Sequence, residues 1–335
     1  MNSVVVFTGV GQVEIQSTEM PMCGPGQMLV RTTKTAISTG TELTILSGDY
    51  PEGSNWARYG NFPFNVGYSH VGEVVEIGEG VEGVAVGDRV AGGSKHMTHV
   101  VVTPASVHRI PDDVDDETAT LWQLGRIACN GVRRASLQMG EAVVVYGLGI
   151  IGQLVCQWAR LDGARPIIGV DLSDSRREFA ERLGGATMVI DGADEDILEQ
   201  VEAATRGRKA DCVFEVTGVA DLIPREMELL RKQGRIIILS SPRGKTTIDL
   251  HDQCNGPSLS IIGAHNGSHP AFETPYNMWT PARNTELFFD LVAAGELRVS
   301  KLITHRYNWS DAPEAYLMLL ADRTQAEAVI LDWTE

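Results

Sequence analysis

One stretch of the chain decides its fold: Val143-Val144-Val145-Tyr146-Gly147-Leu148-Gly149-Ile150-Ile151-Gly152. Its apolar, β-branched first half predicts a buried strand, and its second half is a G-x-G-x-x-G turn leading into a helical pattern over residues 153–161. Gly147 permits a tight turn, Gly149 lets the backbone approach a pyrophosphate, and Gly152 lets the helix pack close to the strand. Since a helix start presents free N–H groups and partial positive charge, we expect these residues, with Leu148, Ile150 and Ile151, to hold a dinucleotide.

The acidic residue that should follow such a turn is present. A second apolar strand, Ile167-Ile168-Gly169-Val170, ends at Asp171, which lies 171 − 152 = 19 residues past the last glycine. A carboxylate at this distance accepts hydrogen bonds from the ribose hydroxyls of NAD and repels the 2′-phosphate of NADP. Arg176 and Arg177 keep NADP open as the less favoured cofactor, although a solvated helix face would also explain them.

The composition is that of a globular protein of about two domains. The 335 residues are 43% hydrophobic and 21% charged, no apolar run is long enough to span a bilayer, and Met1-Asn2-Ser3-Val4 does not open a signal peptide. Five scattered cysteines without a C-x-x-C pair fit a reducing cytoplasm. Because the net charge is −16, nucleic acid and membrane surfaces are not expected as partners. The expected partner is a small-molecule substrate.

The order of predicted elements indicates an α/β protein. Residues 1 to about 118 read as short strands separated by Gly/Pro turns, and residues 119 to about 262 alternate strand and helix. Such alternation predicts a doubly wound parallel sheet of the Rossmann type, covered by helices on both faces. The tail, with helices over 283–294 and 312–321 and β segments over 303–307 and 328–332, is expected to return to the β-rich domain.

At this point the chain resembles the medium-chain dehydrogenase/reductase superfamily, the group of the zinc alcohol dehydrogenases, over nearly its whole length. The resemblance is carried by these stretches: Gly72-Glu73-Val74-Val75-Glu76-Ile77-Gly78, Gly87-Asp88-Arg89-Val90, Glu215-Val216-Thr217-Gly218, and Leu229 to Arg235. It implies a GroES-like catalytic domain over 1–118 and 264–335, and a Rossmann dinucleotide-binding domain over 119–263. It also implies a homodimer or homotetramer. Thr217 and Ser240, at the ends of two expected strands, are further candidate cofactor residues.

The zinc ligands of the resembled family are replaced in this chain. Thr39 stands at the position of the Cys ligand in Thr39-Gly40-Thr41-Glu42, and Tyr68 stands at the position of the His ligand in Gly67-Tyr68-Ser69. The third region, Leu121-Trp122-Gln123-Leu124-Gly125, has no Cys, His or acid. Zinc needs thiolate, imidazole or carboxylate ligands, so we predict no zinc. A substitute site is conceivable from these residues: Glu42, His70, His96 and His99.

Without a metal, a protein group must move the proton during hydride transfer. Tyr68 is the first candidate, Thr41 keeps the hydroxyl that relays the proton in the resembled family, and Thr39 adds a second hydroxyl. His70 is the rival, because in a strand it would share a face with Tyr68. The alternatives are a packing tyrosine, a core or surface histidine, and a threonine that caps the next helix. The stretches around Tyr68 and Thr41 also resemble the zinc-lacking branch that includes bacteriochlorophyllide dehydrogenases, which oxidise a secondary alcohol.

Five residues are candidates for binding the substrate: Gln123, His265, Trp279, Arg283 and Asn284. Trp279 would stack on a ring while Arg283 and Asn284 clamp polar groups, which suits a sugar, a cyclitol or a hydroxy acid. The alternative is that Trp279 anchors a helix, capped by Thr280, and that Arg283 makes a surface ion pair.

Together these features predict an NAD-dependent, zinc-independent dehydrogenase that interconverts a secondary alcohol and a ketone of a polar substrate. A reductase of enones or quinones is the second hypothesis, although the relatives of that kind commonly carry A-x-x-G-x-x-G and use NADPH. A cofactor-binding scaffold without turnover is the third hypothesis.

Overall fold

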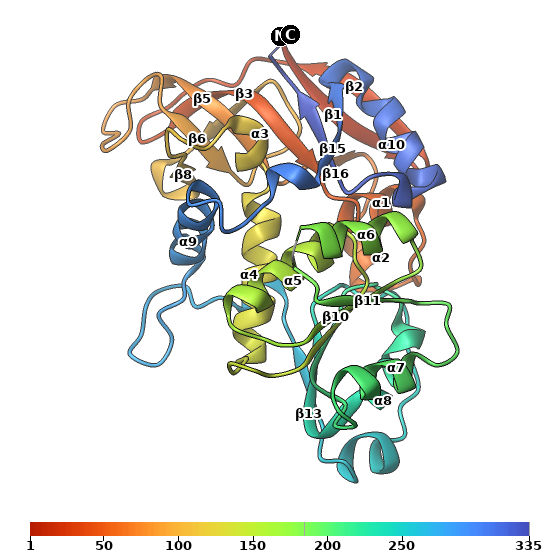
Figure 1. Cartoon of the computed structure of the whole chain (residues 1–335). Helices are drawn as coiled ribbons and strands as arrows, with labels where there is room; N and C mark the ends of the chain where they lie inside the picture. Colours follow the sequence, from red (N-terminus) through yellow and green to blue (C-terminus); the bar gives the residue numbers. More distant parts are fainter. Residues whose placement is uncertain (184, 335) are drawn as a thin grey trace. The chain divides into compact units, whose positions relative to one another are not determined.

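The computed structural model describes residues 1–183 and 185–334. It divides into two compact units, of which unit 1 comprises Met1–Gln123 with Thr285–Glu335, and unit 2 comprises Leu124–Asn284 (Figure 1). The strands are β1 (Asn2–Gly9), β2 (Gln12–Thr18), β3 (Met28–Ile37), β4 (Phe64–Asn65), β5 (His70–Ile77), β6 (Arg89–Gly92), β7 (His99–Val102), β8 (Val107–Arg109), β9 (Val143–Tyr146), β10 (Ile167–Asp171), β11 (Met188–Asp191), β12 (Ala210–Glu215), β13 (Leu230–Ile238), β14 (Ser260–Gly263), β15 (Ile303–Asn308) and β16 (Ala328–Asp332). The α-helices are α1 (Thr41–Ser47), α2 (Asn55–Tyr59), α3 (Asp116–Ala119), α4 (Trp122–Ala135), α5 (Ile150–Leu161), α6 (Asp174–Arg182), α7 (Ile197–Ala204), α8 (Ile223–Glu228), α9 (Pro281–Ala293) and α10 (Ala312–Ala321).

Unit 2 holds the parallel sheet that the alternating pattern predicts. Its strand order is β11-β10-β9-β12-β13-β14, and each neighbouring pair is parallel. Val144 and Tyr146 of β9 pack in one core with Ile197 of α7 and Met227 of α8. Val143 and Val145, which point the other way, are also fully buried, so both faces of the sheet are covered. The Rossmann prediction is therefore confirmed.

Unit 1 is built on a sheet of order β15-β16-β3-β5-β6-β8, with β7 on β3, and a small sheet of order β2-β1-β4. The C-terminal strand β16 pairs antiparallel with β3, where Val329 lies opposite Ile37. The tail therefore returns to the first sheet, as expected. In Figure 1, α10 runs beside the β1–β2 hairpin, with which it packs.

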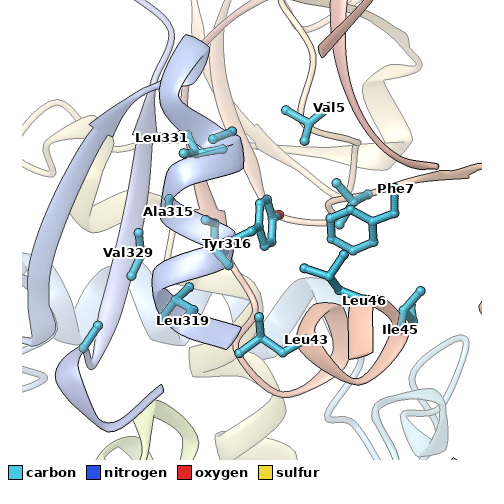
Figure 2. Packing of buried hydrophobic residues seen from close by; sticks show 14 of the residues in the cluster. Val5, Phe7, Leu43, Ile45, Leu46, Ala315, Tyr316, Leu319, Val329 and Leu331 are labelled. Atoms are coloured by element: carbon cyan, nitrogen blue, oxygen red, sulfur yellow. The ribbon is translucent and has the colours of Figure 1, made fainter. Parts of the chain in front are cut away.

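The core of unit 1 joins residues from both ends of the chain. Figure 2 shows Phe7 of β1 next to Tyr316 of α10, and their rings meet edge to face with centroids 5.0 Å apart. Leu46 of α1 and Leu331 of β16 belong to the same buried cluster. Burial of this apolar surface fixes α1, and with it the loop that precedes α1, against the sheet.

The segment 264–284, which we expected in the catalytic domain, groups with unit 2 in the structure. Side chains of α4 explain this, because Asn130 Nδ2 donates to the carbonyl oxygen of His265 at 3.2 Å and Arg133 Nε donates to Asn284 Oδ1 at 2.8 Å. No helix in the described ranges 1–183 and 185–334 combines the length and the apolar character needed to cross a membrane.

Candidate functional site

The glycine-rich turn has the backbone geometry that a pyrophosphate site requires. Gly147 has φ 100°, in the left-handed region, and Gly149 is the N-cap of α5. A Cβ at Gly152 would collide with the carbonyl oxygen of Gly147 and lie 2.9 Å from its carbonyl carbon. Ile150 and Ile151 open α5, so the helix starts at the end of β9 as predicted, with its first N–H groups at the carboxyl edge of the sheet.

Asp171 ties the end of β10 to this turn. Its Oδ2 accepts a hydrogen bond from the backbone N–H of Leu148 at 2.7 Å, and its Oδ1 accepts from Ser173 N–H at 2.8 Å. The Leu148 side chain is fully buried. A Cβ on Gly149 would lie 3.6 Å from Arg176 Nη1, so the Arg176 guanidinium lies over the turn. The cofactor residues expected from sequence are thus brought together at one place in unit 2.

Glu215, at the end of β12, organises the neighbouring strand ends. Its Oε1 accepts hydrogen bonds from Thr217 N–H and Oγ1, both at 2.7 Å, and from Gly218 N–H at 2.9 Å. Its Oε2 accepts from the Ser240 hydroxyl. The Thr217 and Ser240 hydroxyls are thus held by one buried carboxylate, which we did not single out from sequence although it opens the Glu-Val-Thr-Gly stretch.

A second carboxyl group, that of Glu226 in α8, is fully buried near Glu215. Neither of its oxygens has a hydrogen-bond partner among the described residues. Burial, together with the charge of Glu215, raises the pKa of Glu226 from 4.5 to about 9. The folded protein therefore keeps a proton here that the unfolded chain releases, and the free energy of unfolding falls as pH rises from about 4.5 toward 9.

We expect Glu226→Gln to raise the free energy of unfolding by up to about 4 kcal/mol at pH 7.5 and to change it little at pH 4.5. Glu228→Gln, on the exposed side of the same helix, is the matched control and should change stability at neither pH. Urea unfolding of the three proteins at both pH values measures the difference. Equal stability of wild type and Glu226→Gln at pH 7.5 would contradict the raised pKa of Glu226.

The proposed proton-transfer group lies in unit 1. Tyr68 follows Gly67, which has φ 106°, and precedes β5. Its hydroxyl donates to Ser38 Oγ in the loop between β3 and α1. Burial raises the pKa of Tyr68 to about 12, helped by the charge of Glu42 and opposed by hydrogen bonds with Ser38 and Thr41. Tyr68 is therefore a protonated phenol at neutral pH.

The expectation that His70 shares a strand face with Tyr68 is wrong, because β5 begins at His70 and Tyr68 lies in the bend before it. His70 is fully buried, and its Nδ1 lies 2.8 Å from the carbonyl oxygen of Gly92. Burial lowers the pKa of His70 to about 4, so the imidazole is neutral near pH 7.

Thr39 follows Ser38 in the chain, and Thr41 itself makes a hydrogen bond with Tyr68. Thr41 is the first residue of α1, whose N-cap Gly40 supplies no side-chain cap, so the capping alternative for Thr41 is wrong. Thr39 is buried in the same loop, with 9% of its surface exposed. The loop and the first residue of α1 thus carry three hydroxyl side chains, those of Ser38, Thr39 and Thr41, and the sequence analysis did not identify Ser38 as a candidate.

Glu42, the second residue of α1, belongs to a fully buried polar cluster with His96 and Tyr316. Tyr316 Oη donates to Glu42 Oε2 at 2.7 Å, and His96 Nε2 lies 3.4 Å from the same oxygen. Among the described residues, Glu42 Oε1 and His96 Nδ1 have no hydrogen-bond partner. Tyr316 is 274 positions from Glu42, so the sequence held no signal for this contact.

The side chains present do not fit a zinc site. Thr39 and Tyr68 offer hydroxyls, which are poor zinc ligands. Across residues 1–183 and 185–334, no group of three or more His, Cys, Asp or Glu side chains is arranged to hold a metal ion. Of the substitute ligands, His70 is turned to Gly92, and Glu42 is bonded to Tyr316. His99 lies apart, on β7.

The substrate candidates of unit 2 are engaged with one another. The Trp279 ring lies under two guanidinium groups, with Arg133 Cζ 3.3 Å and Arg283 Cζ 4.6 Å from its centroid. Arg283 also approaches Glu273 at 3.6 Å. Thr280 caps α9, as expected, by accepting from Arg283 N–H at 3.3 Å.

The three other candidates differ in exposure. Asn284 is fully buried, whereas His265 is exposed and accepts from Gly267 N–H at 3.0 Å. Gln123 belongs to unit 1 and is buried. Trp279, Arg283, Asn284 and His265 thus share one region of unit 2, and Gln123 is assigned to the other unit.

Comparison with known proteins gives the same architecture. Residues 24–112 match the family profile described as alcohol dehydrogenase GroES-like domain, and residues 151–280 match the one described as zinc-binding dehydrogenase. The L-threonine 3-dehydrogenase of Pyrococcus horikoshii is 30% identical, and the match covers 93% of each chain.

Two solved structures share the fold with TM-scores of 0.82 and cover 99% of both chains. They are 2R,3R-butanediol dehydrogenase from Bacillus subtilis, 23% identical, and a zinc-binding dehydrogenase from Sinorhizobium meliloti bound to NADP, 22% identical. The chain therefore belongs to the zinc-type alcohol dehydrogenase-like family of medium-chain dehydrogenases/reductases, a family of oxidoreductases that use nicotinamide cofactors.

Proposed function

We propose that this protein is an NAD-dependent dehydrogenase that works without catalytic zinc and interconverts a secondary alcohol and a ketone of a polar substrate, such as a sugar, polyol or cyclitol derivative. The observation that carries the proposal is the Tyr68 hydroxyl, bonded to Ser38 and Thr41 at the position where the resembled family has a zinc-binding histidine. The relatives named L-threonine 3-dehydrogenase support the reaction type, because C3 of threonine bears a secondary alcohol.

Unit 2 would hold the cofactor. The N–H groups at the start of α5 would receive the pyrophosphate, and Arg176 over the turn adds a positive charge there. Asp171 favours NAD, since its carboxylate at the end of β10 would repel a 2′-phosphate. When bound, the nicotinamide ring supplies the hydride acceptor or donor.

Unit 1 would move the proton. With a pKa of about 12, Tyr68 carries its proton at neutral pH and is ready to donate it to the oxygen of a ketone that is being reduced. In the oxidation direction the phenolate must accept the proton of the alcohol, so the oxidation rate should rise with pH. His70 is less suited to either role, because its imidazole is enclosed and turned to Gly92.

Reduction of enones or quinones remains the second candidate, and the G-x-G-x-x-G turn with Asp171 is the feature that disfavours it. A scaffold without turnover would bind NADH and show no substrate-dependent change in absorbance at 340 nm. Screening alcohol–ketone pairs against enones and quinones distinguishes these activities.

The zinc-independent part of the proposal is tested by metal analysis. We expect protein purified without chelators to hold far less than one zinc per chain, and dialysis against EDTA to leave turnover unchanged, because Thr39 and Tyr68 supply no zinc ligands. Stoichiometric zinc whose removal abolishes turnover and whose return restores it would overturn this part, while leaving the alcohol–ketone reaction standing.

A further inference from the structure

One face of α4 carries polar and basic side chains that the proposed function does not use. Arg126, Asn130 and Arg133 are spaced four and three residues apart, which places them on the same side of the helix. The segment 265–284 packs on this side, where Asn130 Nδ2 donates to Ser268 Oγ at 3.0 Å and Arg133 Nε donates to Asn284 Oδ1 at 2.8 Å. We call Arg126, Arg133, His269 and Asn284 the α4 cluster.

Positive charge is concentrated in the α4 cluster although the chain has a net charge of −16. The pKa of His269 is lowered by burial and by the charges of Arg126 and Arg133, with a hydrogen bond to the Asn266 carbonyl acting in the opposite direction. Burial raises the pKa of Asp162, and the charge of Arg133 opposes this rise, so the Asp162 carboxyl group lies near Arg133. The guanidinium groups of Arg126 and Arg133 act together on His269, and two positive charges this close together attract an anion.

The α4 cluster also contains buried polar atoms without a hydrogen-bond partner among the described residues. Asn284 is 0% exposed and its Oδ1 is used by Arg133, but its Nδ2 donor is unpartnered. His269 Nδ1 lies 2.7 Å from the Asn266 carbonyl oxygen, and its Nε2 is unpartnered. Leaving a buried donor unsatisfied costs about 1–3 kcal/mol, a cost that a ligand oxygen at Asn284 Nδ2 would remove.

Arg133 is oriented in a way that suits an oxyanion. Its guanidinium carbon lies 3.3 Å from the centroid of the Trp279 ring, so the group uses a flat face for stacking. The N–H bonds of a guanidinium lie in its plane, and stacking therefore fixes the direction in which they donate. A carboxylate or phosphate matches this planar array of donors better than a neutral hydroxyl does.

We infer that the α4 cluster is a binding site for the carboxylate or phosphate group of a small molecule, held by Arg133 and the Asn284 amide. This site lies within unit 2, and Arg133 acts on Asp162 at the C-terminal end of α5, whereas the glycine-rich turn at residues 147–152 lies at the N-terminal end of that helix. Anion binding at this site does not depend on hydride transfer, so the inference can be tested independently of the proposed reaction.

The test is calorimetric titration of the full chain with inorganic phosphate. We expect one site per chain with a Kd of about 1 mM or tighter. Asn284→Asp preserves the shape of the side chain but places a carboxylate beside Arg133, so phosphate affinity should fall at least about 10-fold. Asn308→Asp is the matched control: it adds the same charge in unit 1, where Asn308 accepts from Ser310 N–H and aspartate can do the same, and it should bind phosphate like the wild type.

Two further titrations identify the chemical group and the site that give rise to the heat of binding. Titration with acetate in place of phosphate shows whether a carboxylate alone is sufficient. Titration in the presence of saturating NADH separates the α4 cluster from the glycine-rich turn, and we expect phosphate binding to persist. The inference is overturned if the wild type binds neither anion, if Asn284→Asp binds phosphate with unchanged affinity, or if NADH displaces the phosphate. Urea unfolding of Asn284→Asp should show a midpoint equal to or above that of the wild type, since the new carboxylate pairs with Arg133.

Discussion

Replacing Tyr68 by phenylalanine should lower turnover about 10²-fold or more while NADH affinity stays nearly unchanged. The substitution removes only the hydroxyl that donates to Ser38 and leaves the ring in place before β5. If that hydroxyl exchanges the proton with the substrate oxygen, its loss removes a general acid without altering unit 2, where the cofactor is expected to bind. Steady-state kinetics with an active alcohol–ketone pair and NADH titration by fluorescence measure the two quantities.

Tyr59→Phe is the matched control for loss of a phenolic hydroxyl in the same unit. Tyr59 is 53% exposed and its ring packs on Phe64, so the substitution should leave turnover within about two-fold of wild type. If Tyr68→Phe turns over like the wild type, the proton-transfer role of Tyr68 is rejected, and the buried His70 becomes the next residue to test.

The fold of unit 2 could be predicted because its signals are local. The strand that ends at Tyr146, the glycine-rich turn and the helix that follows are adjacent in sequence, and each has its own periodicity. The strand β2 was not predicted, because its Gln12–Thr18 sequence is polar and mostly exposed. The helix α4 was not predicted as such either, since it contains Gly125 and Gly131, which disfavour helices. Gly131 is needed there, because a Cβ would lie 2.6 Å from Leu239 Cδ2.

Residues of the candidate site could be predicted from the sequence only where they lie within a recognisable motif. Tyr68 and Thr41 were found because they occupy positions within recognisable stretches, and the structure places both hydroxyls near Ser38. The position of His70 was misjudged, because the start of a strand cannot be fixed to one residue from its pattern. The contact of Glu42 with Tyr316 joins distant parts of the chain, and only the tertiary fold brings them together.

The largest structural effect is expected from Gly152→Ala, because the added methyl group has no room. Its Cβ would collide with the Gly147 carbonyl oxygen and lie 3.6 Å from Val145 Cγ1. The nearest atoms are backbone, so a side-chain rotation cannot relieve the collision and α5 must move away from β9. We expect the free energy of unfolding to fall by about 3 kcal/mol.

The same displacement should weaken NADH binding by roughly 10²-fold, since it moves the N–H groups at the start of α5 away from the pyrophosphate position. Gly263→Ala is the control, because a Cβ there meets no atom within 4 Å and the residue lies in the same unit, on β14. Urea unfolding and NADH titration of both variants separate a stability effect from a binding effect. If Gly152→Ala bound NADH as tightly as the wild type, the turn at residues 147–152 would not be where the pyrophosphate sits, and the assignment of the cofactor to this end of the sheet would fail.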